Sequence, residues 1–134
     1  MIKAKRINDQ YGHNVGDIIL STVAGKLQNA IRRTDSLARW GGEEFVILAV
    51  DSDIHQALLL AEKIRETVRE IPFENKITLT VSIGVAEYQP DETFDHFCCR
   101  ADAALYRAKD EGRNRIVIDT QAASIENALN PCGE

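Results

Sequence analysis

The sequence lacks the features that mark membrane, secreted and nucleic-acid-binding proteins. No apolar run approaches the ~20 residues that a helix needs to cross a bilayer, and the first residues do not have the pattern of a signal peptide. The formal charge of −5 argues against a general nucleic-acid-binding domain, which is normally strongly basic. We therefore expect a cytoplasmic domain with no membrane segment and no nucleic-acid partner.

Residues that form disulfides or bind metals are also few. The cysteines are Cys98, Cys99 and Cys132, and neither they nor the 3 histidines have the spacing of a zinc site. Adjacent cysteines rarely form a structural disulfide, so we expect reduced thiols. Cys98 is expected to pack as a small apolar side chain.

The chain does have enough apolar sequence for one core, with 134 residues of which 44% are hydrophobic. Its basic residues are grouped on an acidic background. The groups are Lys3, Lys5 and Arg6; Arg32 and Arg33; and Arg107, Lys109, Arg113 and Arg115. Such local groups suit a small anionic ligand better than a long polyanion, although each group taken singly is also compatible with a solvated face.

Hydrophobic periodicity predicts alternating helices and strands. A short helix is expected over residues 4–10, then a long helix capped by Asn14, with Asp17 in a capping box. Further helices are expected over 54–68 and from Thr93 to Gly112. Strands are expected over residues 36–39, 45–50, 77–86 and 115–118.

This order predicts an α+β fold with a mixed, largely antiparallel sheet flanked by helices. Residues 1–120 are expected to form the domain. Residues 121–134 are polar and aperiodic, and are expected to form a weakly held tail.

The most informative motif is the hexad WGGEEF, residues 40–45. It places Glu43 and Glu44 at a bend between two expected strands, directly after two glycines. Glycine has no Cβ, so the pair allows a sharp turn and the close approach of a bulky anionic ligand. Two adjacent acids there can hold a divalent metal and act on a nearby proton. A hairpin turn with solvated acids is the plain alternative.

Four separated blocks together resemble the GGDEF domains, the diguanylate cyclase family. The blocks are KRINDQYGHNVGD (5–17), GGEEF (41–45), VSIGV (81–85), and ADAALYRAK (101–109) followed by GRN (112–114). The resemblance implies a fold related to the palm of nucleotidyl cyclases and polymerases. It also implies an activity, the condensation of two GTP molecules into cyclic di-GMP and pyrophosphate.

The resemblance implies a role for each acidic residue. Glu43 matches a ligand of Mg²⁺ (or Mn²⁺), and Glu44 matches an acid that helps deprotonate the attacking ribose 3′-hydroxyl. Asn8 and Asp17 match the pair that reads guanine, since an amide and a carboxylate can satisfy its O6, N1 and N2 groups. The capping role of Asp17 would compete for the same oxygens. Gly42 would lie against the substrate.

Two cations match residues that bind the β- and γ-phosphates of GTP. Lys109 and Arg113 are spaced i, i+4, which places both on one face at the end of the third helix. The alternative is that positive charge simply suits the last turn of a helix. Lys5 matches a further phosphate contact.

The segment from Arg32 to Asp35 matches the RxxD product-inhibition site of the family, and five residues separate it from Gly41. Arg32 would bind guanine or phosphate of cyclic di-GMP, and Asp35 would bind a guanine edge. Lys63 lies where family members often carry a supporting arginine. Lysine has the same charge as arginine but lacks its planar guanidinium, which can form two parallel hydrogen bonds.

The start of the chain departs from the family pattern, whose first strand ends in D-x-D-x-F-K. Lys5 matches the lysine, but Ala4 replaces the phenylalanine and Ile2 the second aspartate. The first aspartate, which is the other metal ligand, would precede Met1. We therefore expect a truncated domain that lacks its first strand, has little cyclase activity and is open to strand exchange.

The resemblance also implies partners. Each domain would hold one GTP, so catalysis would need a homodimer in which two nucleotides meet face to face. A sensory module is expected upstream in the full protein. The alternative function is that of a non-catalytic module that senses cyclic di-GMP.

Overall fold

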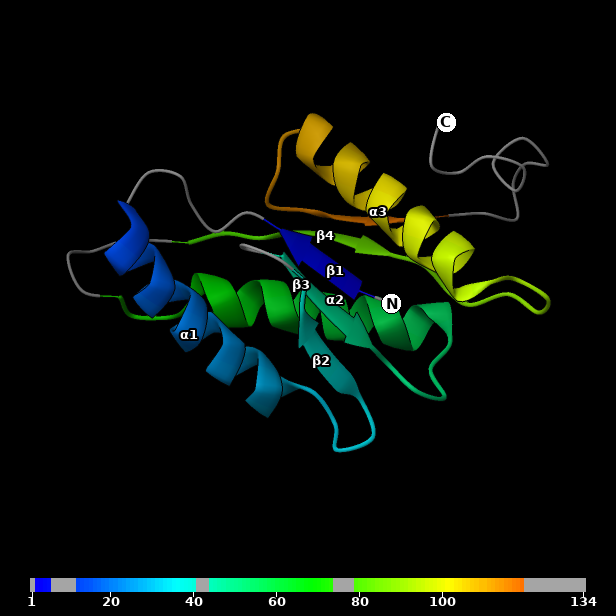
Figure 1. Ribbon diagram of the computed structural model, residues 1–134, viewed down its shortest axis with the longest axis horizontal. Coiled ribbons are helices and arrows are strands. Elements are labelled where there is room, and N and C mark those ends of the chain that lie inside the picture. Colours follow the sequence, from blue (N-terminus) through cyan, green and yellow to red (C-terminus); the bar gives the residue numbers. More distant parts are fainter. Residues whose placement is uncertain (1, 6–11, 41–43, 74–78, 120–134) are drawn as a thin grey trace.

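The computed structural model describes residues 2–5, 12–40, 44–73 and 79–119 (Figure 1). Helices and strands are interleaved along the chain, and β2 is followed directly by β3. In order they are β1 (Ile2–Lys5), α1 (Gly12–Ala30), β2 (Ser36–Arg39), β3 (Glu44–Leu48), α2 (Ile54–Arg69), β4 (Ser82–Val85), α3 (Phe94–Asp110) and β5 (Ile116–Ile118). Among the described residues, no helix is both long and apolar enough to cross a membrane. The expected tail, residues 121–134, lies outside this part of the chain.

The strands form one sheet in the order β2-β3-β1-β4-β5. Three of the strand pairs are antiparallel, and only the pairing of β4 with β5 is parallel. The sheet is therefore mixed and largely antiparallel, as the sequence predicts.

The first residues of the chain correct two expectations. Ile2–Lys5 form a strand, so a helix is wrong for Ala4 and Lys5, while residues 6–10 lie outside the described part. All four residues of β1 pair with both β3 and β4. The sheet therefore contains this strand, contrary to the expectation. Because β1 is paired on both sides, the centre of the sheet is not open to strand exchange.

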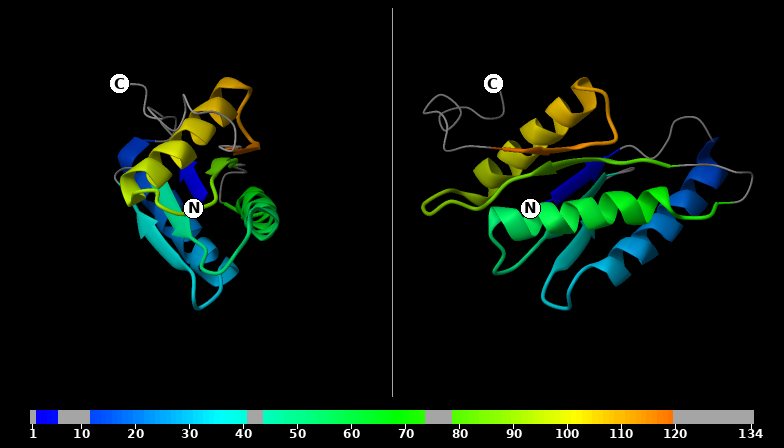
Figure 2. Two further views of the ribbon diagram at one scale, coloured as in Figure 1. Left: turned by 90° about the vertical axis from the view of Figure 1, so that its right-hand side faces the viewer. Right: turned by 180° about the vertical axis from the view of Figure 1, so that it is seen from behind.

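Helices cover both faces of the sheet (Figure 2). The larger core cluster joins α1 and α2 to one face, through residues such as Val23, Ile64 and Ile83. The smaller cluster joins α3 to the other face, where Phe97 and Ala101 pack with Val46. Burial of each such apolar side chain stabilises the fold by about 1.5–3 kcal/mol.

Gly84 allows α3 to lie directly on β4. A Cβ atom at this position would be 2.3 Å from the carbonyl oxygen of Ala101 and 2.3 Å from the nitrogen of Leu105. Real Cβ atoms do not approach backbone so closely, so only glycine fits without a shift of the helix. This contact fixes the position of α3, whose last turn carries Lys109.

Two helix starts can be compared with their expected caps. Thr93 caps α3 as expected, because its hydroxyl accepts a hydrogen bond from the N–H of His96 (3.1 Å). Asn14 does not cap α1, since that helix already begins at Gly12. Asp17 therefore lies beyond the first turn, where its side chain is exposed.

The cysteines differ from one another. Cys98 is buried among Phe97 and Ala101, as expected for a small apolar side chain. Cys99 is disulfide-bonded, so the expectation of reduced thiols is wrong for this residue. Its partner lies outside the described residues.

Candidate functional site

The segments predicted to bind substrate converge on one end of the sheet, on the left in Figure 1. Lys5, the last residue of β1, lies between Glu44 at the start of β3 and Ser82 at the start of β4. The turn after α3 reaches the same end, because the N–H of Ile83 donates to the carbonyl of Arg115 (3.0 Å). Four segments far apart in sequence thus meet at what we call the substrate end.

The two strands that flank the hexad are paired antiparallel at this end. The N–H of Trp40 donates to the carbonyl of Glu44 (2.7 Å), which closes the connection between β2 and β3. Glu44 is half-buried at the first position of β3. Gly42 and Glu43 lie outside the described residues, as does Asn8, so their predicted roles are not placed by the structure.

The last turn of α3 leads into a tight reversal. Gly112, Arg113 and Asn114 have φ angles of 122°, 61° and 46°, all in the left-handed region. The N–H of Arg113 donates to the carbonyl of Ala108 (2.9 Å), which satisfies one of the last acceptors of the helix. Arg113 is exposed and Lys109 is half-buried. The turn that carries Arg113 reaches the substrate end through the hydrogen bond between Arg115 and Ile83.

Asp17 approaches the substrate end from α1. The helix begins at Gly12, shortly after β1, and Figure 1 shows its start on the same side as the tip of β1. Because Asp17 is exposed and not a first-turn cap, its carboxylate is accessible to a ligand.

The described residues do not form a complete metal site. They contain no group of three His, Cys, Asp or Glu residues placed to hold a metal ion. Position 2, which matches the second family aspartate, is an isoleucine, whose side chain has no oxygen.

Arg32, Asp35 and Lys63 are brought together at the opposite end of the sheet, which we call the product end. They line a cavity of about 230 Å³ together with Ala30, Ser52, Gln56, Leu59 and Leu60. The Nζ of Lys63 donates to the carbonyl of Ala30 at the end of α1 (3.0 Å). Lys63, which is distant in sequence, thus lies beside the same cavity as Arg32 and Asp35.

Asp35 is held within the protein. Its side chain is 1% exposed and that of Arg32 is 54% exposed. The Nη2 and Nε of Arg32 donate to the carboxylate at 3.2 and 3.3 Å, and the backbone N–H groups of Arg32 and Val50 donate at 3.0 and 3.2 Å. Burial acts to raise the pKa of Asp35, but these hydrogen bonds from Arg32 and Val50 outweigh it and lower the pKa below its usual value.

The surroundings of Asp35 fix one edge of the Arg32 guanidinium. Its Nη2 also donates to the carbonyl of Val50 (2.6 Å) and to the hydroxyl of Ser52 (2.9 Å). More than half of the side chain remains exposed toward solvent. Arg32 is therefore held in a fixed orientation with part of its surface available to a ligand.

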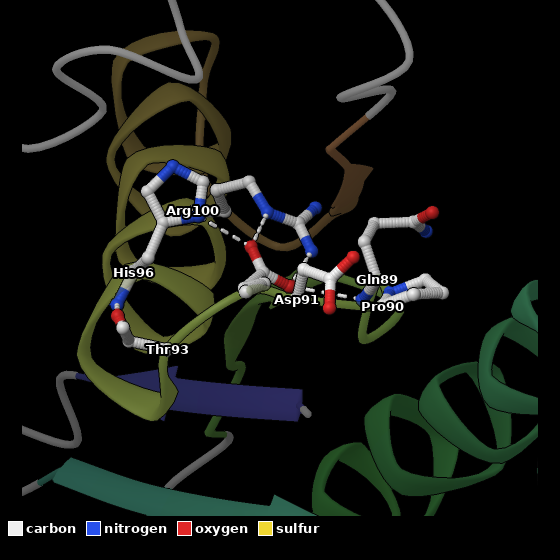
Figure 3. Close-up of a pocket in the computed structure, with 7 residues that line it drawn as sticks. Gln89, Pro90, Asp91, Thr93, His96 and Arg100 are labelled. Carbon is white, nitrogen blue, oxygen red and sulfur yellow. Dashed lines mark hydrogen bonds and ion pairs between the residues drawn. The ribbon is translucent and has the colours of Figure 1, made fainter.

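A further cavity of about 440 Å³ lies beside the start of α3 (Figure 3). Its wall includes Arg100, which is buried and forms two hydrogen bonds with the carboxylate of Glu92 (2.6 and 2.7 Å). Arg100 also donates to Asp119 (2.8 Å) and to the carbonyl of Glu87 (2.6 Å). These bonds tie the loop before α3 to the end of β5.

This network was not predicted from the sequence. A signal was available, because Arg100 falls between Phe97 and Ala101 on the apolar stripe of the helix. Burial acts to raise the pKa of Glu92, but hydrogen bonds from Arg100, the N–H of Gln89 and His96 lower it to about 2. No described buried side-chain nitrogen or oxygen lacks a hydrogen bond, so the network is satisfied without a ligand.

The protein is an α+β domain in which acidic and basic residues from distant segments meet at one end of the sheet, the substrate end. The family whose description is "Diguanylate cyclase, GGDEF domain" matches residues 2–115. The chain therefore belongs to the GGDEF family.

Curated relatives and solved structures agree with this assignment. Diguanylate cyclase DgcM of Escherichia coli is 46% identical over 113 residues, and response regulator PleD of Caulobacter vibrioides is 39% identical over 119 residues. The active GGEEF domain of a diguanylate cyclase from Vibrio cholerae aligns with a TM-score of 0.81 and 34% identity. That alignment covers 90% of this chain and 81% of the other. The GGDEF domain of DgcB from Caulobacter crescentus, solved in complex with c-di-GMP, aligns with a TM-score of 0.80 and 31% identity over 88% of this chain and 76% of the other.

The chain matches only part of its longer relatives. The alignments cover 84% of this chain but 28% of DgcM and 26% of PleD.

Proposed function

We propose that this chain is a diguanylate cyclase domain that binds one GTP at the substrate end. The observation that carries the proposal is that Lys5, Glu44 and the turn that contains Arg113 all lie at the substrate end of the sheet. Two such domains in a homodimer would bring two nucleotides face to face, so that each ribose 3′-hydroxyl attacks the α-phosphorus of the other. The products would be cyclic di-GMP and pyrophosphate.

Different residues of the substrate end would bind different parts of GTP. Asn8 and Asp17 would read guanine, because adenine would leave their hydrogen-bonding groups unpaired. Lys5, Lys109 and Arg113 would bind the β- and γ-phosphates and stabilise the charge that grows on the leaving pyrophosphate. Gly42 would let the backbone approach the nucleotide.

The acids of the hexad would act at the reacting atoms. Glu44 would accept the proton of the 3′-hydroxyl. Glu43 would be a ligand of Mg²⁺ (or Mn²⁺). The described residues contain no group of three His, Cys, Asp or Glu residues that would complete a metal site, so no step is assigned to the metal.

Calorimetry with GTP and ATP tests the nucleotide site. GTP should bind, and ATP should bind at least about tenfold more weakly, because a mismatched base leaves buried polar groups unpaired. Asp17→Asn should narrow that preference, since an amide cannot replace both acceptors of the carboxylate. Equal binding of GTP and ATP by the unchanged chain would contradict the proposal.

A second candidate function is a non-catalytic sensor of cyclic di-GMP. The observation that favours it is the cavity at the product end, where Arg32 is held with its side chain 54% exposed. Binding of cyclic di-GMP without any binding of GTP would support the sensor, whereas binding of both ligands would support a cyclase domain with product inhibition. A cytoplasmic location and an upstream sensory module remain predictions.

A further inference from the structure

The turn after α3 has a conformation that its sequence does not favour. Gly112 accepts positive φ readily, but Arg113 and Asn114 follow it in the same left-handed region, with φ of 61° and 46°. Asparagine enters this region more easily than arginine does, although both prefer negative φ. The conformation of the turn therefore depends on the hydrogen bonds that hold it.

A side chain of α2 supplies such a contact. The Nη1 of Arg65 donates to the Oδ1 of Asn114 (3.2 Å), across 49 residues of sequence. Arg65 is itself fixed, because its Nη2 lies 3.0 Å from the carboxylate of Glu62 and 3.5 Å from that of Glu66. Only 21% of its side chain is exposed. A fixed guanidinium on a packed helix thus restrains the last residue of the turn.

The other bonds of the turn restrain its first part. The N–H of Gly112 donates to the carbonyl of Lys109 (3.4 Å), and that of Arg113 to Ala108 (2.9 Å). The carbonyl of Arg113 accepts a hydrogen bond from Nε of Arg115 (3.3 Å), a residue that is exposed. Among the described residues, the side chain of Arg65 connects Asn114 to α2, and the N–H of Ile83 connects Arg115, just after the turn, to β4.

We propose that Arg65 is a positioning residue for GTP binding: through Asn114 it holds the Gly112–Asn114 turn in the conformation that presents Arg113 to the triphosphate. This role rests on the proposed GTP site. Arg65 does not contact substrate and acts only through the turn. Its loss should weaken interactions with the β- and γ-phosphates and leave those with guanine unchanged.

Arg65→Gln and a matched control, Arg69→Gln, test the role. Arg69 is also on α2, but within the described part of the chain its guanidinium pairs with Glu66 (2.7 Å) and not with the turn. In Arg65→Gln, hydrogen exchange at the Arg113 amide should accelerate at least about fivefold, and GTP affinity should fall about three- to tenfold, the range for loss of one hydrogen bond. GMP affinity should not change. Arg65→Lys, which keeps a positively charged donor on a long side chain, should recover part of the GTP affinity.

The outcomes separate this role from the proposed function. If the unchanged chain binds GTP no better than GMP, phosphate recognition fails, and with it the proposed GTP site. If that preference is present and Arg65→Gln matches Arg69→Gln in both exchange and GTP affinity, the positioning role of Arg65 is overturned and the GTP site stands. Equal losses of GTP and GMP affinity would also overturn it, because they would indicate a general loss of structure.

Discussion

Arg100 shows how one side chain can connect a loop, a helix and a strand. Its guanidinium is almost fully buried, and it lies between the carboxylates of Glu92 and Asp119. A buried charge is tolerated only when its donors are satisfied, and here Glu92 accepts two of its hydrogen bonds. Its plane also lies near the Phe97 ring, with Cζ 5.8 Å from the ring centroid.

Replacement of Arg100 by glutamine should lower the free energy of unfolding by about 3–5 kcal/mol, because Glu92 would remain buried without its cation. Urea denaturation measures this change. The control is Arg107→Gln on the same helix, where an exposed pair with Glu111 at 3.9 Å should contribute less than about 0.5 kcal/mol. Equal effects of the two substitutions would show that the buried network does not stabilise the fold.

At the scale of elements, the packing of α3 on β4 depends on the absence of a side chain at Gly84. Gly84→Ala should destabilise the domain by about 1–3 kcal/mol or more, because its Cβ would meet backbone atoms of Ala101 and Leu105 at 2.3 Å. Gly25→Ala is a matched control in α1, where no atom lies within 4 Å of the added Cβ. That substitution should stabilise by up to about 1 kcal/mol, since alanine favours helix. Thermal unfolding of the two variants compares these effects directly, and a stable Gly84→Ala variant would contradict the packing described.

The helices with a strong periodic pattern could be predicted from the sequence, whereas β1 could not. Of the described part of the expected strand 77–86, only Ser82–Val85 form a strand. The apolar stripes of α2 and α3 and the cap at Thr93 give local signals that the structure confirms. Ile2–Lys5 is too short for periodicity to decide, and its conformation is set by pairing with β3 and β4, which are distant in sequence. The hydrogen bond between Arg65 and Asn114 could not be predicted either, because nothing near Arg65 in the sequence indicates this partner.

The candidate sites were predicted by motif, but their internal contacts were not. The spacing of Arg32 and Asp35 before Gly41 predicts a product-binding site, yet only the fold shows that Val50 and Ser52 complete the support of the guanidinium. Hydrogen bonds between loops depend on where the strands end in space. Motif spacing contains no such information.

At the scale of the whole molecule, the sheet separates two sites. The substrate end lies at the start of β3, and the product end lies beyond its last residue, Leu48, which pairs with Ser36 just after Asp35. At about 3.3 Å per residue, β3 alone sets a separation on the order of 13 Å. The two candidate sites therefore lie at opposite ends of β3 and share no residue.

This separation predicts opposite effects of two substitutions. Arg32→Ala should lower the affinity for cyclic di-GMP by about 10- to 100-fold, the range for a charge-assisted hydrogen bond, and change GTP affinity by less than about twofold. Arg113→Ala should show the reverse pattern. Calorimetry with both ligands measures all four values, with Arg33→Ala as the control for charge beside Arg32. If Arg32→Ala weakened GTP and cyclic di-GMP equally, the two ends could not be separate sites.

The stability of the whole domain should depend on pH through its buried carboxylates. Glu92 has a pKa of about 2 in the folded protein against an ordinary value of 4.5. A pKa that is lower in the folded state means that the unfolded chain binds more protons, so stability is fully present above about pH 5 and is lost as the pH falls toward 2. For Glu92 this loss is about 3 kcal/mol, and Asp35, whose pKa is also lowered, adds to it in the same direction.

Urea denaturation from pH 6 to pH 2.5 should show this decline in the free energy of unfolding, and Glu92→Gln should show a shallower decline. A free energy of unfolding that stays constant over this range would mean that Glu92 is not held as its ionised form by Arg100.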